Sequence, residues 1–202
     1  MQRLLDVLAS GIHDTKNQLF SAESLIAESE KKHGIDLAEV RYAIEAASDR
    51  LSRTLTAYRL MRHDAKLAII PTIPADLCDE VVLAQKHHLE KANLRLTLDC
   101  QALDAWPMDR DLVTDMLNNA VQNAGRVARG EILLSAFEEG RELVFRVEDD
   151  GPGFSSLPPA GGTGLMVAEK LARMHTNKER HGSLKLSNDS LLGGACFELR
   201  LP

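Results

Sequence analysis

A short segment rich in isoleucine and proline, residues 69–74, divides the chain into two parts with different residue patterns. Before this segment, apolar residues recur at three- and four-residue steps, which predicts helices. Pro71 and Pro74 interrupt that helical period. After them, strand-like and helix-like stretches follow one another, which predicts a mixed α/β domain. We therefore expect two domains, residues 1–66 and residues 74–202.

The first part predicts an antiparallel pair of helices. From Leu5 to Ile26 the apolar residues keep a spacing close to a heptad. Gly34 can take the left-handed conformation that often ends a helix, and Asp36 with Glu39 resembles a capping box that opens a second helix. Because one such hairpin cannot bury both apolar stripes, we expect two chains to pair as a homodimeric four-helix bundle.

The second part predicts an α+β domain from the alternation of its residue patterns. Its expected helices are residues 76–91, 109–128 and 167–175, and its expected strands are residues 94–98, 131–134, 143–147, 183–186 and 196–201.

Composition excludes several classes of function. The net charge is −6, and the basic residues are scattered among acidic ones, so no nucleic-acid surface is expected. No apolar run is long enough to cross a bilayer, and the N-terminus is too polar for a signal peptide. Cys78, Cys100 and Cys196 lack metal-ligand spacing and suit a reducing compartment. We expect a cytoplasmic protein without membrane insertion.

The histidine motif, residues 12–19, lies on the first predicted helix and contains candidate catalytic residues. His13 follows the apolar Ile12 and should lie on the flank of the bundle. A neutral imidazole is a good nucleophile near pH 7, and the neighbouring Asp14 can orient the ring or take its proton. Asn17 lies one helical turn along and could hold a water molecule. The alternative is an ordinary solvated helix face.

The asparagine motif, residues 119–123, lies on a predicted helix of the second domain. Asn119 and Asn123 are four positions apart and share one helix face. Amide oxygens are hard ligands that suit Mg²⁺, whereas asparagine is a poor helix former. The alternative is ordinary capping or solvation of the helix.

Two glycine-rich motifs follow. In the first glycine motif, residues 149–153, Asp149 ends an apolar strand, and its carboxylate could accept a hydrogen bond from an adenine-type amino group. Gly151 and Gly153 would let such a ring approach the backbone, although a tight turn is the plain alternative. The second glycine motif, residues 161–165, opens a helix and could bind an anion through backbone amides.

Together and in this order, the four motifs resemble the H, N, G1 and G2 boxes of two-component sensor histidine kinases. The matching residues are His13-Asp14-x-x-Asn17, Asn119-x-x-x-Asn123-Ala124-x-Arg126, Asp149-x-Gly151-x-Gly153 and Gly162-Thr163-Gly164-Leu165. The resemblance implies a dimerisation and histidine phosphotransfer domain in residues 1–66. It also implies a GHKL (Bergerat-type) ATP-binding sandwich from residue 74 onward, with helices on one face of a mixed sheet.

By this resemblance, the γ-phosphoryl group of ATP would pass to His13 and then to an aspartate of a response-regulator receiver domain. Asp14 would activate the ring, and Asn17 would position water for dephosphorylation of the regulator. Asn123, with Asn119, would hold Mg²⁺. The residues implied in nucleotide binding are Asn119, Asn123, Arg126, Asp149, Gly151, Gly153, Gly162, Thr163, Gly164 and Leu165.

Three departures from the family pattern leave other functions open. The segment between Phe154 and Gly162 is short, Met166 stands where a third glycine is usual, and residues 176–180 precede His181 in place of an immediate glycine pair. These changes predict a weaker phosphate cradle. One alternative is therefore a histidine phosphotransferase or phosphatase with little or no use of ATP. A second is a non-catalytic dimeric regulatory partner. No sensor precedes His13 in this sequence. If this is the natural chain, input is expected from a separate sensory protein, from another domain encoded elsewhere, or not at all; the sequence fits an excised kinase core equally well.

Overall fold

The computed structural model describes residues 15, 18–19, 21–22, 25–26, 29–30, 32–37, 39–44, 47–48, 51, 67–157 and 163–202, with residues 163–166 described by their backbone alone. The chain divides into two compact units, Met1–Lys66 and Leu67–Pro202. Among the described residues, no helix combines the length and the apolar character needed to cross a bilayer.

In the first unit, the described residues are helical on both sides of a turn at Gly34. Gly34 has a φ of +65°, the predicted left-handed conformation, and its N–H donates to the Glu30 carbonyl at 2.9 Å. The Glu30 carboxylate accepts from the Leu37 N–H at 2.8 Å and pairs with Arg41 at 3.4 Å. The turn is thus confirmed, whereas the dimeric bundle stays a prediction.

The second unit is built on a five-stranded mixed sheet. Its strand order is β2-β4-β5-β9-β8; β2 pairs parallel with β4, and the other neighbours are antiparallel. These strands are β2 (Arg95–Cys100), β4 (Glu131–Glu139), β5 (Glu142–Asp149), β8 (Ser183–Ser187) and β9 (Cys196–Leu201).

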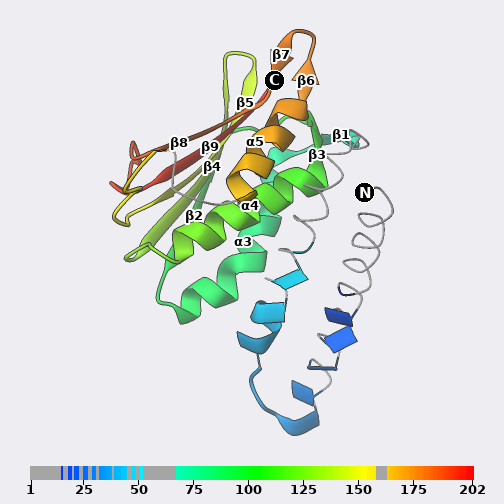
Figure 1. Cartoon of the computed structure of the whole chain (residues 1–202), viewed down its shortest axis with the longest axis vertical. Helices are drawn as coiled ribbons and strands as arrows, with labels where there is room; N and C mark the ends of the chain where they lie inside the picture. The colour runs from blue at the N-terminus through cyan, green and yellow to red at the C-terminus, as the bar shows by residue number, and fades with distance from the viewer. Residues whose placement is uncertain are drawn as a thin grey trace, which may run out of the picture. The chain divides into compact units, whose positions relative to one another are not determined.

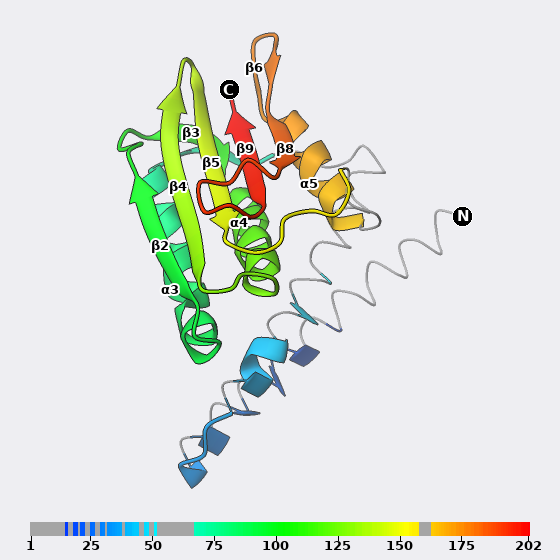
Figure 2. The same cartoon turned by 90° about the vertical axis from the view of Figure 1, so that its left-hand side faces the viewer.

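Three helices cover one face of this sheet, as Figures 1 and 2 show: α3 (Pro74–Lys91), α4 (Arg110–Gly125) and α5 (Thr163–Met174). Pro74 occupies the start of α3, where its missing N–H costs no helical hydrogen bond. The alternate residues Leu143 and Phe145 of β5 are fully buried, as are Leu77 of α3 and Leu117 of α4. The predicted α+β class, with helices on one face of a mixed sheet, is confirmed.

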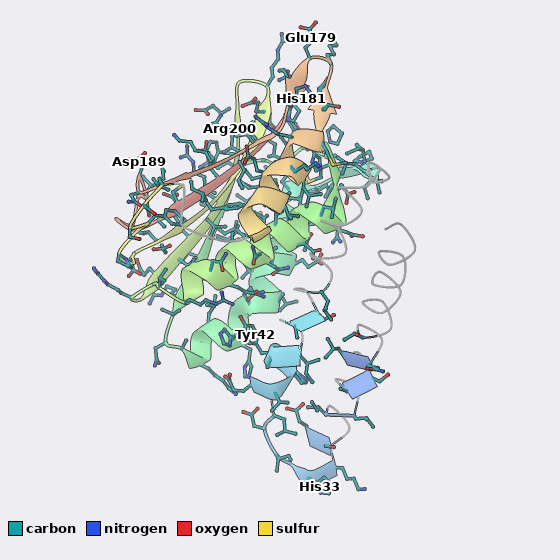
Figure 3. The ribbon with its side chains drawn as sticks, in the orientation of Figure 1. His33, Tyr42, Glu179, His181, Asp189 and Arg200 are labelled. Carbon is teal, nitrogen blue, oxygen red and sulfur yellow. The ribbon has the colours of Figure 1, made fainter. Side chains whose placement is uncertain are left out.

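Charged side chains form ion pairs between neighbouring strands on the face of the sheet opposite the core residues. Arg146 of β5 pairs with Glu198 of β9 at 2.6 Å, and Arg200 bonds to the other oxygen of Glu198 at 2.7 Å. Figure 3 labels Arg200 among the strands of the sheet. Because side chains alternate between the two faces of a strand, Arg146 and Glu198 point away from Phe145 and its neighbour Leu199.

Four short strands were not predicted. The ribbon of β1 (Ile69–Thr72) and β3 (Trp106–Asp109) contains Pro71 opposite Pro107, and β6 (Thr176–Asn177) pairs with β7 (Arg180–His181). Proline has no backbone N–H to donate. It is tolerated in an isolated two-stranded ribbon because each strand there has a partner on one side only. Residues 67–73, placed before the expected second domain, belong to the second compact unit.

We expect the core to depend on Leu77 far more than on Leu83, although both lie on α3. Leu77 is fully buried and Leu83 is 75% exposed. Leu77→Ala should lower the free energy of unfolding by about 2–5 kcal/mol, and Leu83→Ala should change it by less than about 0.5 kcal/mol. Unfolding of this unit in urea would be followed by the fluorescence of Trp106, the only tryptophan in the sequence. Equal losses in the two variants would contradict the described packing of α3.

Candidate functional site

Asp149 ends β5 with its side chain buried, 3% exposed. Its Oδ1 accepts hydrogen bonds from the backbone N–H groups of Gly151 at 2.8 Å and Ala195 at 3.2 Å. A buried carboxylate is costly unless it is hydrogen-bonded, and backbone amides supply this compensation. Neither bond uses Oδ2. Within the described part of the chain, the carboxylate is thus held through Oδ1, and Oδ2 can accept a further donor.

The β8–β9 loop, residues 188–195, wraps around the same strand end. Ser190 Oγ and Gly194 N both donate to the Asp149 carbonyl at 2.9 Å. A Cβ placed on Gly194 would lie 2.3 Å from Asp149 Oδ1 and 2.4 Å from its carbonyl oxygen. Only glycine fits there. Sequence reasoning missed this loop; its signal is the Gly193-Gly194 pair just before the last strand.

The first glycine motif also contacts the segment that follows α4. A Cβ on Gly151 would lie 2.6 Å from the carbonyl oxygen of Val127. Asp150 Oδ1 accepts from the N–H groups of Arg129 at 2.7 Å and Gly130 at 3.2 Å. Desolvation acts to raise the pKa of Asp150, but these amides outweigh it, and the pKa lies below its usual value. The end of β5 and the end of α4 are therefore tied together.

The asparagine motif lies on α4, close to this junction. Asn119 is half-buried and Asn123 is exposed, one turn further along the helix. Arg126, just past the helix end, donates from Nη1 to Asn123 Oδ1 at 3.3 Å. The neighbouring Asn118 has a different partner, since its Oδ1 accepts from Gln85 Nε2 of α3 at 2.9 Å. Asn118 thus joins two helices, whereas Asn123 and Arg126 pair on the surface.

The start of α4 is fixed by Asp109, the residue that precedes the helix. Its Oδ1 caps α4 by accepting from Leu112 N at 3.2 Å, and its Oδ2 accepts from Ala68 N at 2.8 Å. The backbone N–H of Asp109 donates to Nε2 of the buried His175 at 3.1 Å, while His175 Nδ1 lies 3.0 Å from the Leu171 carbonyl. The histidine thus links the end of α5 to the start of α4.

The second glycine motif leads into α5, which begins at Thr163 and so includes the backbone of Gly164 and Leu165. The helix was expected to begin only at residue 167. Gly162 lies outside the described residues, as do His13, Asp14 and Asn17. The structure therefore brings together the first glycine motif, the end of α4 and the β8–β9 loop. The remaining predicted site residues stay predictions.

A groove of about 530 Å³ lies elsewhere, between the C-terminal half of α3 and the start of β2. Leu89, Asn93 and Leu96 are among its lining residues, and none of the predicted site residues is. Within the described part of the chain, no three His, Cys, Asp or Glu side chains form a group that could hold a metal ion.

The part of the chain that contains Asp149 matches a known protein family. Residues 108–202 match the family described as the histidine kinase-, DNA gyrase B- and HSP90-like ATPases. This segment therefore matches an ATPase domain that histidine kinases share with DNA gyrase B and HSP90. It contains the asparagine motif, both glycine motifs and the β8–β9 loop, so the resemblance seen in the sequence is confirmed for this domain.

Curated proteins similar to this chain include sensor kinases. The chain is 28% identical over 177 residues to the two-component sensor PhoQ of Pseudomonas aeruginosa, covering 80% of this chain and 35% of that protein. It is 24% identical over 213 residues to the virulence sensor histidine kinase PhoQ of Salmonella typhimurium, covering 96% of this chain and 40% of that protein. The chain thus spans well under half the length of these relatives.

Solved structures share the fold. The Acinetobacter baumannii histidine kinase AdeS matches with a TM-score of 0.65 at 17% identity, over 92% of this chain and 95% of that one. Full-length ShkA in complex with AMPPNP matches with a TM-score of 0.67 at 18% identity, over 99% of this chain and 45% of that one. At these identities, the likeness establishes the fold of the ATPase domain.

The buried His175 makes the stability of this domain depend on pH. Burial lowers its pKa below the usual value, more than the Leu171 hydrogen bond and the Asp109 carboxylate raise it. Below about pH 6.5 the unfolded chain binds a proton that the folded histidine does not. The free energy of unfolding should therefore fall as the pH drops from 7.5 to 5.5, measured by urea unfolding and Trp106 fluorescence.

His175→Gln is the matched variant for this measurement. It should be less stable than the wild type at pH 7.5, because the link between α5 and Asp109 is weakened. It should also lose less stability between pH 7.5 and 5.5. A wild type and variant with the same pH dependence would show that His175 is not the group responsible.

Proposed function

We propose that the chain is the catalytic core of an ATP-dependent, autophosphorylating protein histidine kinase of a two-component system. The observation that carries this proposal is the buried carboxylate of Asp149, fixed by the amides of Gly151 and Ala195 inside a domain of the histidine kinase-type ATPase family. The relatives named as sensor kinases, and the AMPPNP complex of ShkA, support it.

Asp149 would recognise the base. The exocyclic amino group of adenine is a donor, and Asp149 Oδ2 is an acceptor that neither backbone amide occupies. Guanine carries a carbonyl at the equivalent position, which would leave a buried carboxylate facing an acceptor. Gly151 and Gly153 would let the base approach the backbone. The site should therefore prefer ATP over GTP.

The asparagine motif fits a magnesium ion by its chemistry. Mg²⁺ prefers oxygen ligands and usually keeps several waters together with substrate phosphates, so it needs few protein groups. Asn123 is exposed, and from the described residues its oxygen accepts a long 3.3 Å bond from Arg126, which it could exchange for the ion. Asn119 and Asn123 would hold the ion, which when bound would offset the charge of the phosphates. Arg126 would then be released to face the phosphates as well.

The second glycine motif would hold the phosphate chain. α5 begins at Thr163, and Gly164 and Leu165 continue its first turn. Gly162 is the residue before Thr163 in the sequence. Unpaired N–H groups at a helix N-terminus favour an anion. Positioning of this kind accounts for much of the catalysis in phosphoryl transfer.

His13 would be the phosphoryl acceptor. A ring nitrogen would form a bond to the γ-phosphorus as the bond to the ADP oxygen breaks, and the ring proton would pass to Asp14. The phosphoryl group would then move to an aspartate of a response-regulator receiver domain. Asn17 would position the water molecule that removes the phosphoryl group from that regulator. Retention of Asp149, Gly151 and Gly153 favours this reading over a relay without ATP, which needs none of them.

The proposed assembly follows the two compact units. Residues 1–66 would form the dimerisation and phosphotransfer domain of a homodimer, and residues 74–202 would form the ATP-binding domain. Both would lie in the cytoplasm, with input from a sensory protein or another domain. One structural relative, the cytoplasmic segment of histidine kinase QseC, supports this location.

The proposal predicts that wild-type protein incubated with Mg²⁺ and γ-labelled ATP acquires label that is labile in acid and stable in alkali. His13→Gln should remove essentially all of it, because the acceptor nitrogen is gone. His33→Gln, at the turn of the first unit, should label like the wild type. Label that persists on His13→Gln would exclude His13 as the acceptor, and a wild type that binds nucleotide without labelling would favour the relay or phosphatase alternative.

A further inference from the structure

Asn188, which none of the four motifs contains, makes a two-way hydrogen bond with the backbone just after the first glycine motif. Phe154 N donates to Asn188 Oδ1 at 2.7 Å, and Asn188 Nδ2 donates to the Phe154 carbonyl at 3.0 Å. The two residues are 34 positions apart. Flipping the amide would set donor against donor and acceptor against acceptor, so the pair fixes one orientation of the side chain.

Gly153 packs closely against the Asn188 side chain. It has a φ of +74°, a conformation that favours glycine. A Cβ at Gly153 would lie 2.8 Å from Asn188 Oδ1. The second glycine of the motif and the Asn188 side chain are therefore matched to each other. Without the Asn188 side chain, the backbone at Gly153 and Phe154 would lose its bond to the neighbouring loop.

The same loop also holds the other end of the motif. Asn188 is the first residue of the β8–β9 loop, in which Ser190 Oγ bonds to the Asp149 carbonyl and Ala195 N bonds to Asp149 Oδ1. One loop therefore fixes Asp149 at the start of the first glycine motif and Phe154 just past its end. This arrangement sets the shape of the motif between them.

We propose that Asn188 is a positioning residue of the nucleotide site, which holds the first glycine motif in the shape that binds the base. This inference rests on the proposed function, since it assigns Asn188 a role in retaining ATP. Asn188 acts through the backbone of Phe154 and Gly153. Its loss should therefore weaken nucleotide binding and leave the rate of phosphoryl transfer at saturating ATP unchanged.

The test compares Asn188→Ala with Asp189→Ala in the full chain. Asp189, labelled in Figure 3, bonds to Ser187 Oγ through its backbone N–H, so truncating its side chain leaves that bond in place. Stopped flow with a fluorescent ATP analogue and Mg²⁺ gives the dissociation rate and Kd, and initial labelling rates against ATP concentration give KM and kcat. Loss of two hydrogen bonds should raise Kd and KM about 3- to 10-fold in Asn188→Ala, with kcat unchanged. Asp189→Ala should match the wild type.

Two further measurements make the result specific. Asn188→Asp keeps the acceptor for Phe154 N but loses the donor, so its Kd should lie between those of the wild type and Asn188→Ala. The amide of Phe154 should exchange with deuterium faster in Asn188→Ala than in Asp189→Ala.

The outcomes separate the two proposals. If the wild type binds the analogue and Asn188→Ala binds it equally well, the positioning role is overturned and the proposed function stands. If the wild type binds no nucleotide, the proposed function fails, and this inference fails with it. Weaker binding that merely follows a lower unfolding midpoint, seen by Trp106 fluorescence, would make Asn188 a stabiliser of the fold and would also overturn the positioning role.

Discussion

The structure around the site depends on keeping the carboxylate of Asp149 buried at the end of β5. Removing a charged group from water is costly, and here backbone N–H groups from two segments offset the cost. Those segments must approach so closely that Gly151 and Gly194 leave no room for a Cβ. The glycines near the site therefore follow from close backbone packing around one charge, before any ligand is considered.

A second set of contacts fixes the helix that carries the asparagine motif. Asp109 caps α4, bonds to Ala68 and meets the ring of His175 through its own N–H. At the other end of the helix, Asp150 holds the backbone that follows. Both ends of α4 are thus anchored by carboxylates that accept backbone amides. The exposed Asn123 and Arg126 therefore lie on a helix whose two ends are held by hydrogen bonds, beside the first glycine motif.

The helices and central strands could be predicted from the sequence because they are long and their apolar residues keep a clear period. The ribbons β1–β3 and β6–β7 could not, since their strands are two to four residues long. Asp149, Gly151 and Gly153 stand out as a local motif. Asn188 and Gly194 do not, because their partners lie far along the chain and become neighbours only when β5 and β9 pair. Local motifs thus identify the start of a site, and strand pairing completes it.

The central claim is that Asp149 binds the adenine base of ATP, and calorimetric titration of Mg²⁺-ATP into the wild type and Asp149→Asn tests it most directly. A hydrogen bond to a charged acceptor is worth about 1.5–3 kcal/mol, so the variant should bind about 10- to 100-fold more weakly. The wild type should also prefer ATP over GTP. Equal affinity of the two proteins for ATP, with both folded by Trp106 fluorescence, would contradict the account.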